Sequence, residues 1–222
     1  MNPSPSNSQN LKHSQDSQDW TTPDGLRLHS QSWQPCQPWQ PRASVMIVHG
    51  YAEHSGRYAH VADHLVAQGF GVYALDLRGH GRSQGERGMI RCFADFWSDL
   101  DLFWSQIPPT RPVFLLAHSM GTLVALGFLR QVRPTLAGPT LTGLITTGTV
   151  LAIDQDVPSW RIQTVTALSQ LWPRLPVARL SSREISRDPA VVAAYDRDPL
   201  VYRGAVKAKT AVELFGAARQ LR

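Results

Sequence analysis

Cysteine is scarce in this sequence. Its two cysteines, Cys36 and Cys92, lie far apart and in no spacing typical of metal ligands. A disulfide framework or a zinc site needs more cysteines at closer spacing. We therefore expect two reduced thiols in a cytoplasmic protein.

Long apolar runs and clusters of basic residues are also missing. No stretch approaches the roughly 18 apolar residues that indicate a membrane span, and the N-terminal segment has no apolar region of the secretory-signal type. The net charge is +5, but Lys and Arg are dispersed rather than gathered in a run. The sequence therefore predicts neither a transmembrane helix nor a nucleic-acid partner.

The most informative stretch is Pro112–Val124, with the sequence PVFLLAHSMGTLV. The apolar run Val113–Leu116 is typical of a strand buried on both faces, and apolar residues from Leu123 onward recur at helical spacing. Between them, the pattern small-x-Ser-x-Gly around Ser119 indicates a nucleophile elbow, a strained turn that lifts a serine hydroxyl clear of a sheet. The first small residue is Ala117 instead of Gly. The same stretch also fits a buried strand–turn–helix in which Ser119 only caps the helix.

The rest of the chain divides into three regions. Residues 1–20 are rich in Ser, Gln and Asn and predict a disordered tail. Residues 21–150 begin with a short two-stranded edge meander and then alternate strands with helices, which predicts an α/β fold with a mostly parallel central sheet. Because ligand sites lie beyond the carboxyl ends of such strands, we expect His49, Gly50, the loop 76–81 and Ser119 to meet at one rim.

Residues 151–222 carry helical periodicity and no strand pattern. One helix is expected over residues 158–180, with Trp160 and Leu168 among its apolar residues. We interpret this region as a helical cap inserted over the rim. Surface helices packed elsewhere on the sheet are the alternative.

Four segments together resemble a known family: HGYAEHSGRY, ALDLRGHGRSQGERG, LLAHSMGTLVAL and ISRDPAVVAAYDRDPLVYRG. In this order and spacing they resemble the monoacylglycerol lipase and lysophospholipase branch of the α/β-hydrolase fold, of the serine aminopeptidase S33 type. The resemblance extends from about Gly25 to the last residue. It implies antiparallel N-terminal edge strands, a helical cap, and a hydrolase of carboxylic esters such as monoacylglycerol or lysophospholipid.

The resemblance also implies roles for individual residues. Ser119 matches the nucleophile, and the backbone N–H groups of Tyr51 and Met120 match the oxyanion hole. It implies no metal, no cofactor, a small lipid or ester substrate, and a cap that leans on a membrane surface or only closes the pocket. A serine aminopeptidase or small-ester hydrolase is an alternative, and a non-catalytic ligand-binding protein is another. The expected pocket residues are His49, Gly50, His118, Trp160 and Leu168.

Several other polar residues of the rim loops are expected to shape those loops and not to act in catalysis. They are His49, His54 and His80, an ion pair of Glu53 with Arg57, and an ion pair of Asp76 with Arg78 or Arg82.

The sequence holds no histidine that could complete the catalytic group in the expected order. In this fold the chain order is Ser, then an acid, then His, yet all eight histidines precede or immediately adjoin Ser119 on its N-terminal side. Later aspartates match structural positions of the family pattern. We expect two further strand–helix units, about 45–70 residues, in a complete hydrolase. The chain is interpreted as a fragment of such a hydrolase and is predicted to be inactive or nearly so by itself. A degenerate binding protein, or completion by another chain, are the alternatives.

Overall fold

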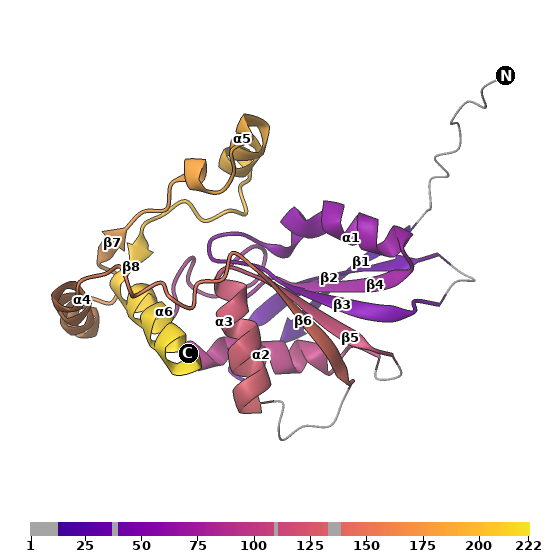
Figure 1. Ribbon diagram of the computed structural model, residues 1–222, viewed down its shortest axis with the longest axis horizontal. Coiled ribbons are helices and arrows are strands. Elements are labelled where there is room, and N and C mark those ends of the chain that lie inside the picture. Colours follow the sequence, from indigo (N-terminus) through magenta and orange to yellow (C-terminus); the bar gives the residue numbers. More distant parts are fainter. Residues whose placement is uncertain (1–12, 37–39, 109–110, 133–138) are drawn as a thin grey trace.

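A six-stranded sheet forms the centre of the molecule. The computed structural model describes residues 13–36, 40–108, 111–132 and 139–222 (Figure 1). The strand order is β1-β2-β4-β3-β5-β6. Strands β3 to β6 run parallel to one another, whereas β1 and β2 form an antiparallel edge. The expected mostly parallel sheet with an antiparallel N-terminal edge is therefore confirmed. The strand bounds are β1 His13–Thr21, β2 Arg27–Pro35, β3 Ala43–Val48, β4 Phe70–Leu75, β5 Val113–His118 and β6 Leu141–Thr147.

Helices cover both faces of this sheet. Helix α1 (Ala59–Ala67) lies on one face, and α2 (Ala94–Trp104) and α3 (Met120–Gly127) lie on the other (Figure 1). Strand β3 is buried along its whole length, as its continuous apolar run predicts. Helix α3 continues into a π-turn at Phe128–Val132. The larger apolar cluster joins the sheet to α2 and α3, and the smaller one joins it to α1.

The N-terminal edge extends further than the sequence indicates. Strand β1 pairs with β2 over its whole length, from His13 opposite Pro35 to Thr21 opposite Arg27. The prediction of a disordered tail is therefore wrong for residues 13–20, and residues 1–12 lie outside the described residues. The strand was hidden because its Ser, Gln and Asp side chains lack the apolar alternation of a half-buried strand. An edge strand exposed on both faces does not need that alternation.

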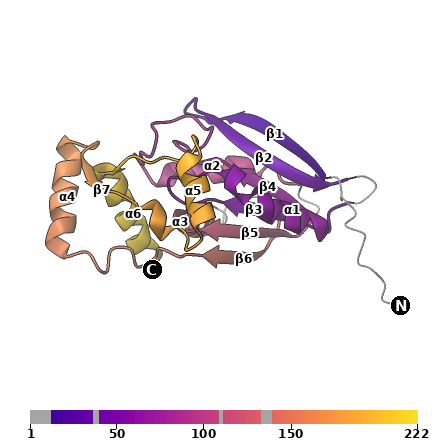
Figure 2. The ribbon, with the colours of Figure 1, turned by 90° about the horizontal axis from the view of Figure 1, so that it is seen from above.

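The segment after β6 is mostly helical. It holds α4 (Ser159–Leu171), α5 (Pro189–Arg197) and α6 (Ala208–Leu221), with a short 3₁₀ turn at Ser182–Glu184. Two short strands, β7 (Pro176–Ala178) and β8 (Val206–Lys207), pair antiparallel, so the prediction of no strand in this region is wrong. Figure 2 shows α4 at one end of the molecule and the hairpin β1–β2 toward the other.

Helix α6 belongs to the packed core of the molecule. Its residues Leu214, Ala217 and Ala218 are buried in the same cluster as α2 and α3. A cap that covers all of residues 151–222 therefore does not fit, because this last helix packs beside α3. The name cap is kept for residues 151–207, which precede α6. Helix α4 in turn packs on α6. Among the helices that the structure describes, none is long and apolar enough to cross a membrane.

Candidate active site

Ser119 occupies a strained turn between β5 and α3. Its backbone dihedrals are φ 51° and ψ −120°, in a region that residues other than glycine rarely adopt. The Ser119 N–H donates to the carbonyl of Thr147 at the end of β6, 2.9 Å away, which ties the turn to the neighbouring strand. These dihedrals give the turn the form that the pattern around Ser119 predicts, an elbow at the carboxyl end of the sheet.

Two glycines allow close contacts around this turn. A Cβ on Gly121 would lie 2.3 Å from the carbonyl oxygen of Val48, so only glycine lets α3 approach the end of β3. A Cβ on Gly50 would lie 3.1 Å from the Ser119 Cβ. The loop after β3 therefore passes directly against the nucleophile candidate.

The two predicted oxyanion donors lie on either side of this contact. Met120 is the first residue of α3, and the N–H at that position has no acceptor one turn back within the helix. Tyr51 directly follows Gly50, and its hydroxyl donates to the carbonyl of Gly88, 2.8 Å away. The Tyr51 ring packs edge-on against His80, which fixes the loop. The assignment of these two N–H groups as an oxyanion hole stays a prediction that this arrangement supports.

Glu53 holds the same loop from inside. One of its carboxylate oxygens accepts from the Gly50 N–H at 2.7 Å and from the Tyr58 hydroxyl at 2.8 Å. The other lies 3.4 Å from the Arg57 Nε, so the expected pair of Glu53 and Arg57 is confirmed. The guanidinium of Arg57 also lies over the ring of Tyr195, 4.7 Å from its centroid. The loop beside Ser119 is thus braced by Glu53 and Arg57 and linked to α5.

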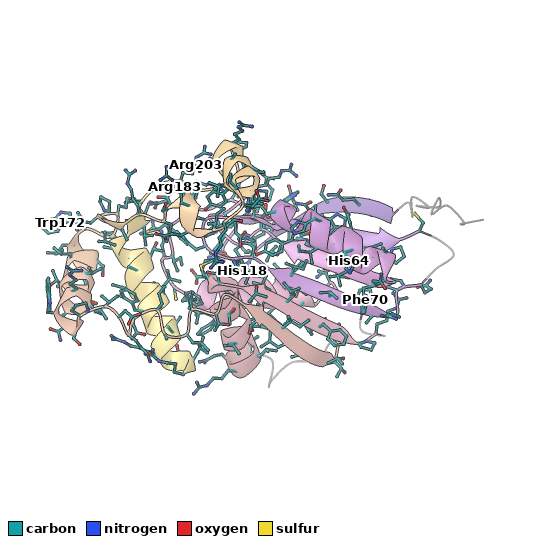
Figure 3. The ribbon with its side chains drawn as sticks, turned by 45° about the horizontal axis from the view of Figure 1, so that its top comes forward. His64, Phe70, His118, Trp172, Arg183 and Arg203 are labelled. Carbon is teal, nitrogen blue, oxygen red and sulfur yellow. The ribbon has the colours of Figure 1, made fainter. Side chains whose placement is uncertain are left out.

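A hollow opens over Ser119 with a volume of about 310 Å³. The rim loops and the sheet supply one side of it, and the segment from residue 180 to α5 supplies the other. Figure 3 shows His118 at the sheet and Trp172 at the far end of the cap. The lining residues are Gly50, Tyr51, Glu53, Arg57, His118, Ser119, Leu180, Ser181, Glu184, Ile185 and Tyr195.

Three predicted pocket residues do not line this hollow. His49 is fully buried behind the loop, and Trp160 and Leu168 lie on α4, which packs against α6. Trp160 is 63% exposed. The helix expected over residues 158–180 is confirmed only as far as Leu171, and periodicity alone does not say which way the helix faces. The cap residues that do line the hollow come from the 3₁₀ turn, the residues beside it and α5, and the mostly polar sequence of this segment gave no such indication.

The buried histidines hold the rim loops together, as expected. The His49 Nε2 accepts from the Leu77 N–H at 2.9 Å and its Nδ1 donates to the Gly50 carbonyl at 2.7 Å, so one ring joins two loops. Burial lowers the pKa of His49 and lowers that of His80 to about 3. Both rings are therefore neutral braces at physiological pH. His54 lies 2.8 Å from an Asp198 oxygen, which connects the first rim loop to the end of α5.

The second expected ion pair differs from the structure. Asp76 accepts hydrogen bonds from the backbone N–H groups of Ser55 and Arg82 and from the Ser55 hydroxyl. Although burial opposes ionisation, these hydrogen bonds help to keep the pKa of Asp76 below its ordinary value. Arg78 pairs instead with Asp99, 2.6 Å away. Asp76 thus anchors loop backbone and is not in an ion pair with Arg78 or Arg82.

No histidine is positioned as a base for Ser119 in the described residues. In that part of the chain, no hydrogen bond joins the Ser119 Oγ to an imidazole, and His118 is the one histidine that lines the hollow. The His118 Nδ1 lies 2.9 Å from the hydroxyl of Thr147. The described part of the chain also holds no group of three or more His, Cys, Asp or Glu that could bind a metal ion. What is present is a strained serine with adjacent backbone donors.

The fold and this turn together define an α/β-hydrolase: a mostly parallel sheet, antiparallel at its N-terminal edge, with a serine elbow after β5. The sequence model of the serine aminopeptidase S33 family matches residues 39–222. The chain belongs to this family.

The chain is also similar to proteins that are named as monoacylglycerol or monoglyceride lipases. The chain is 35% identical over 200 residues to the monoacylglycerol lipase of Mycolicibacterium smegmatis, covering 89% of this chain and 69% of that protein. It is 31% identical over 201 residues to human monoglyceride lipase, covering 89% and 64%. Among solved structures, the monoacylglycerol lipase of Paleococcus ferrophilus superposes with a TM-score of 0.68 at 26% identity, covering 95% of this chain and 72% of that one. The chain thus spans about two thirds of the length of these curated relatives.

Proposed function

We propose that this chain supplies the nucleophile and the oxyanion hole of an ester hydrolase that acts on monoacylglycerol or lysophospholipid. The strained backbone of Ser119 is the observation that carries the proposal, because this conformation exposes the serine hydroxyl above the end of the sheet, where it can attack a substrate. The similarity to monoacylglycerol lipases supports the substrate class.

The proposed reaction proceeds through an acyl-enzyme. The Ser119 Oγ attacks the ester carbonyl, and the N–H groups of Tyr51 and Met120 stabilise the oxyanion. Water then releases the fatty acid. A histidine must accept the serine proton and return it to the leaving alcohol. We infer that this base and its acid lie outside the described residues, and that the 222-residue chain alone is inactive or nearly so.

The hollow favours a substrate with an apolar chain and a polar head. Leu180, Ile185 and the Tyr195 ring supply apolar surface from the cap side, while Glu53 and Arg57 supply polar groups near the sheet. The cap also exposes large apolar residues away from the hollow, namely Trp160, Leu171 and Trp172. We propose that this surface makes transient contact with a membrane from which the lipid is taken.

Hydrolysis of monooleoylglycerol by the protein purified from its natural source tests this proposal, with released oleate as the readout. Ser119→Ala is expected to lower turnover at least about 10³-fold, because removal of a serine nucleophile has effects of this size or larger. Ser105→Ala, an exposed serine after α2, serves as the matched control and leaves turnover unchanged. Unchanged turnover in Ser119→Ala would refute the assignment, and absence of any esterase activity would favour a ligand-binding protein.

A further inference from the structure

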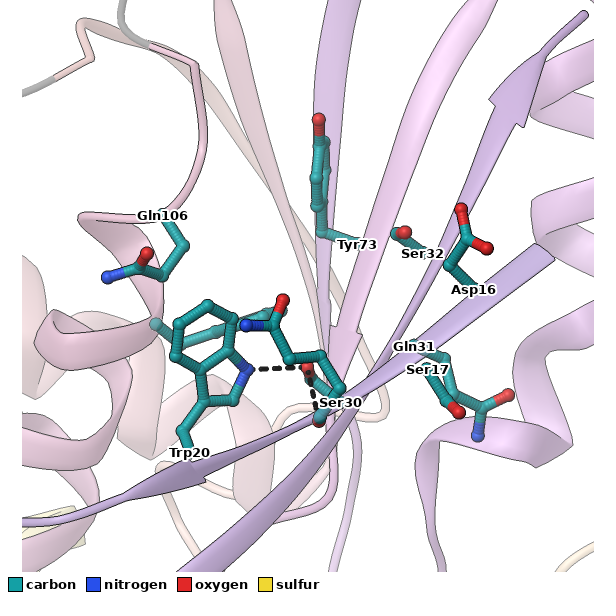
Figure 4. Close-up of a pocket in the computed structure, with 10 residues that line it drawn as sticks. Asp16, Ser17, Trp20, Ser30, Gln31, Ser32, Tyr73 and Gln106 are labelled. Carbon is teal, nitrogen blue, oxygen red and sulfur yellow. Dashed lines mark hydrogen bonds between the residues drawn. The ribbon is translucent and has the colours of Figure 1, made fainter. Parts of the chain in front are cut away.

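A second hollow lies on the α2 face of the N-terminal edge of the sheet and shares no residue with the hollow over Ser119. Its volume is about 400 Å³, within the range of roughly 300–1,000 Å³ that is typical of small-molecule sites. Figure 4 shows Trp20, Tyr73 and Gln106 around it. The lining residues are Asp16, Ser17, Gln18, Trp20, Ser30, Gln31, Ser32, Tyr73, Phe103 and Gln106.

The strand register decides which side chains face this hollow. Asp16 lies opposite Ser32 on β1 and β2, and Ser32 lies opposite Tyr73 on β4, so these three share one face. Ser17 and Gln31 are one residue out of step and belong to the other face. The Gln31 amide indeed donates to the Ser55 hydroxyl on the α1 side, 3.0 Å away, and its side chain points away from the hollow in Figure 4.

Small side chains create the hollow. Strand β2 is an interior strand, yet toward α2 it carries Ser30 and Ser32, where a larger residue would fill the space. The Trp20 Nε1 donates to the Ser30 hydroxyl at 2.7 Å, and that hydroxyl donates to the Gln18 carbonyl at 3.0 Å (Figure 4). The indole is therefore fixed in one orientation. Hydroxyls form the floor of the hollow, and aromatic rings, including that of Tyr73, form its walls.

The chemistry of the lining selects the ligand. The side chains on this face offer a carboxylate, which accepts hydrogen bonds, and amide and hydroxyl groups, which both donate and accept them, together with three aromatic rings. None of the ten lining residues is Lys, Arg or His, so the lining has no positive charge with which to hold a phosphate or carboxylate, and its Asp16 carboxylate would repel one. A neutral ligand with many hydroxyls and an apolar C–H face satisfies both kinds of surface.

We propose that this hollow binds a neutral saccharide, of mono- or disaccharide size, with its C–H face against the aromatic wall and its hydroxyls on Asp16, Gln18, Ser32 and Gln106. The proposal does not depend on ester hydrolysis. It assigns a ligand site to the hairpin, on a different part of the sheet from the elbow.

Saturation-transfer NMR on the 222-residue chain tests the site, with glucose and maltose as neutral probes and glucuronate as the charged one. The neutral sugars are expected to bind, and glucuronate more weakly. Ser32→Leu fills the floor and is expected to weaken binding at least about tenfold. Gln15→Leu, on the opposite face of the neighbouring strand β1 and outside the lining of the hollow, is the control and is expected to leave binding unchanged.

Gln106→Ala provides a second variant that does not depend on how the sheet tolerates leucine. Gln106 is exposed just after α2, where an alanine leaves the fold intact, and the loss of its amide is expected to weaken binding by about threefold or more. Absence of any neutral-sugar signal at about 10 mM, or equal losses in Ser32→Leu and Gln15→Leu, would overturn the proposal.

Discussion

Replacement of Gly121 by alanine tests how tightly the elbow is packed. Gly121 lies at the start of α3, two residues after Ser119. A Cβ there would lie 2.3 Å from the Val48 carbonyl oxygen and 2.7 Å from that of His49, whereas such contacts essentially never fall below 3.0 Å. Both neighbours are backbone atoms that cannot rotate away. Helix α3 and the end of β3 must therefore move apart to accept the methyl group.

Two opposing effects determine how much Gly121→Ala changes the free energy of unfolding. Alanine in place of glycine favours a helix by about 1 kcal/mol. Overpacking of a well-filled interior costs about 1–3 kcal/mol, and a rigid backbone contact belongs to the upper part of that range. We therefore expect Gly121→Ala to lower the free energy of unfolding by about 1–2 kcal/mol.

Urea denaturation of the 222-residue chain measures this difference. A loss of this size moves the midpoint to lower urea by roughly 0.5 M. The matched control is Gly216→Ala, in the middle of α6, where a Cβ meets nothing within 4 Å. That variant is expected to gain up to about 1 kcal/mol from helix propensity alone. If Gly121→Ala were as stable as the wild type or more so, the account of close packing at the elbow would be wrong.

Two further predictions concern charge. Burial lowers the pKa of His80 from 6.5 to about 3, so the unfolded chain takes up a proton in this interval and the folded chain does not. The contribution of the neutral His80 ring to the free energy of unfolding is thus fully present above pH 6.5 and is lost as the pH drops toward 3. His80→Gln is expected to make the free energy of unfolding fall less steeply between pH 6.5 and 3, as measured by denaturation at a series of pH values. His64→Gln, on the exposed face of α1, is expected to leave that slope unchanged. Equal slopes in the wild type and both variants would contradict the role of burial. Glu86 accepts hydrogen bonds from Arg174 and Lys207 and links the loop after β4 to the segment before β7 and to β8. Because these side chains are partly exposed, Glu86→Gln is expected to lower the free energy of unfolding by about 1 kcal/mol or less. The same variant is expected to speed tryptic cleavage after Arg179. Unchanged cleavage would show that these ion pairs do not hold the cap in place.

The central part of the site was predictable from sequence because local rules determine it. The apolar run before Ser119, the small residues around it and the helical spacing after it each permit only a narrow range of backbone conformations. The positive φ of Ser119 agrees with this prediction. The bracing of the loops by His49 was also expected, since a short loop after a buried strand must satisfy its buried polar groups.

The remaining parts depend on packing that no local pattern encodes. Strand β1 consists mostly of polar residues and forms because β2 offers it a hydrogen-bonding edge. Trp160 has the apolar character of a pocket residue, yet α4 uses another face to pack on α6 and leaves it exposed. Conversely, Tyr195 reaches the hollow because Arg57 lies over its ring, a contact between residues far apart in sequence. Tertiary contacts of this kind decide which cap residues face a substrate.

Peptide-level mass spectrometry after fluorophosphonate treatment tests the central claim most directly. It is applied in parallel to the protein from its natural source and to the 222-residue chain. We predict that the source protein carries the phosphonyl adduct on Ser119 and that the 222-residue chain reacts weakly or not at all, because no described histidine is placed to activate that hydroxyl. An adduct on a different serine of the source protein would contradict the assignment of the nucleophile. Strong labelling of Ser119 in the 222-residue chain would contradict the inference that the base lies elsewhere.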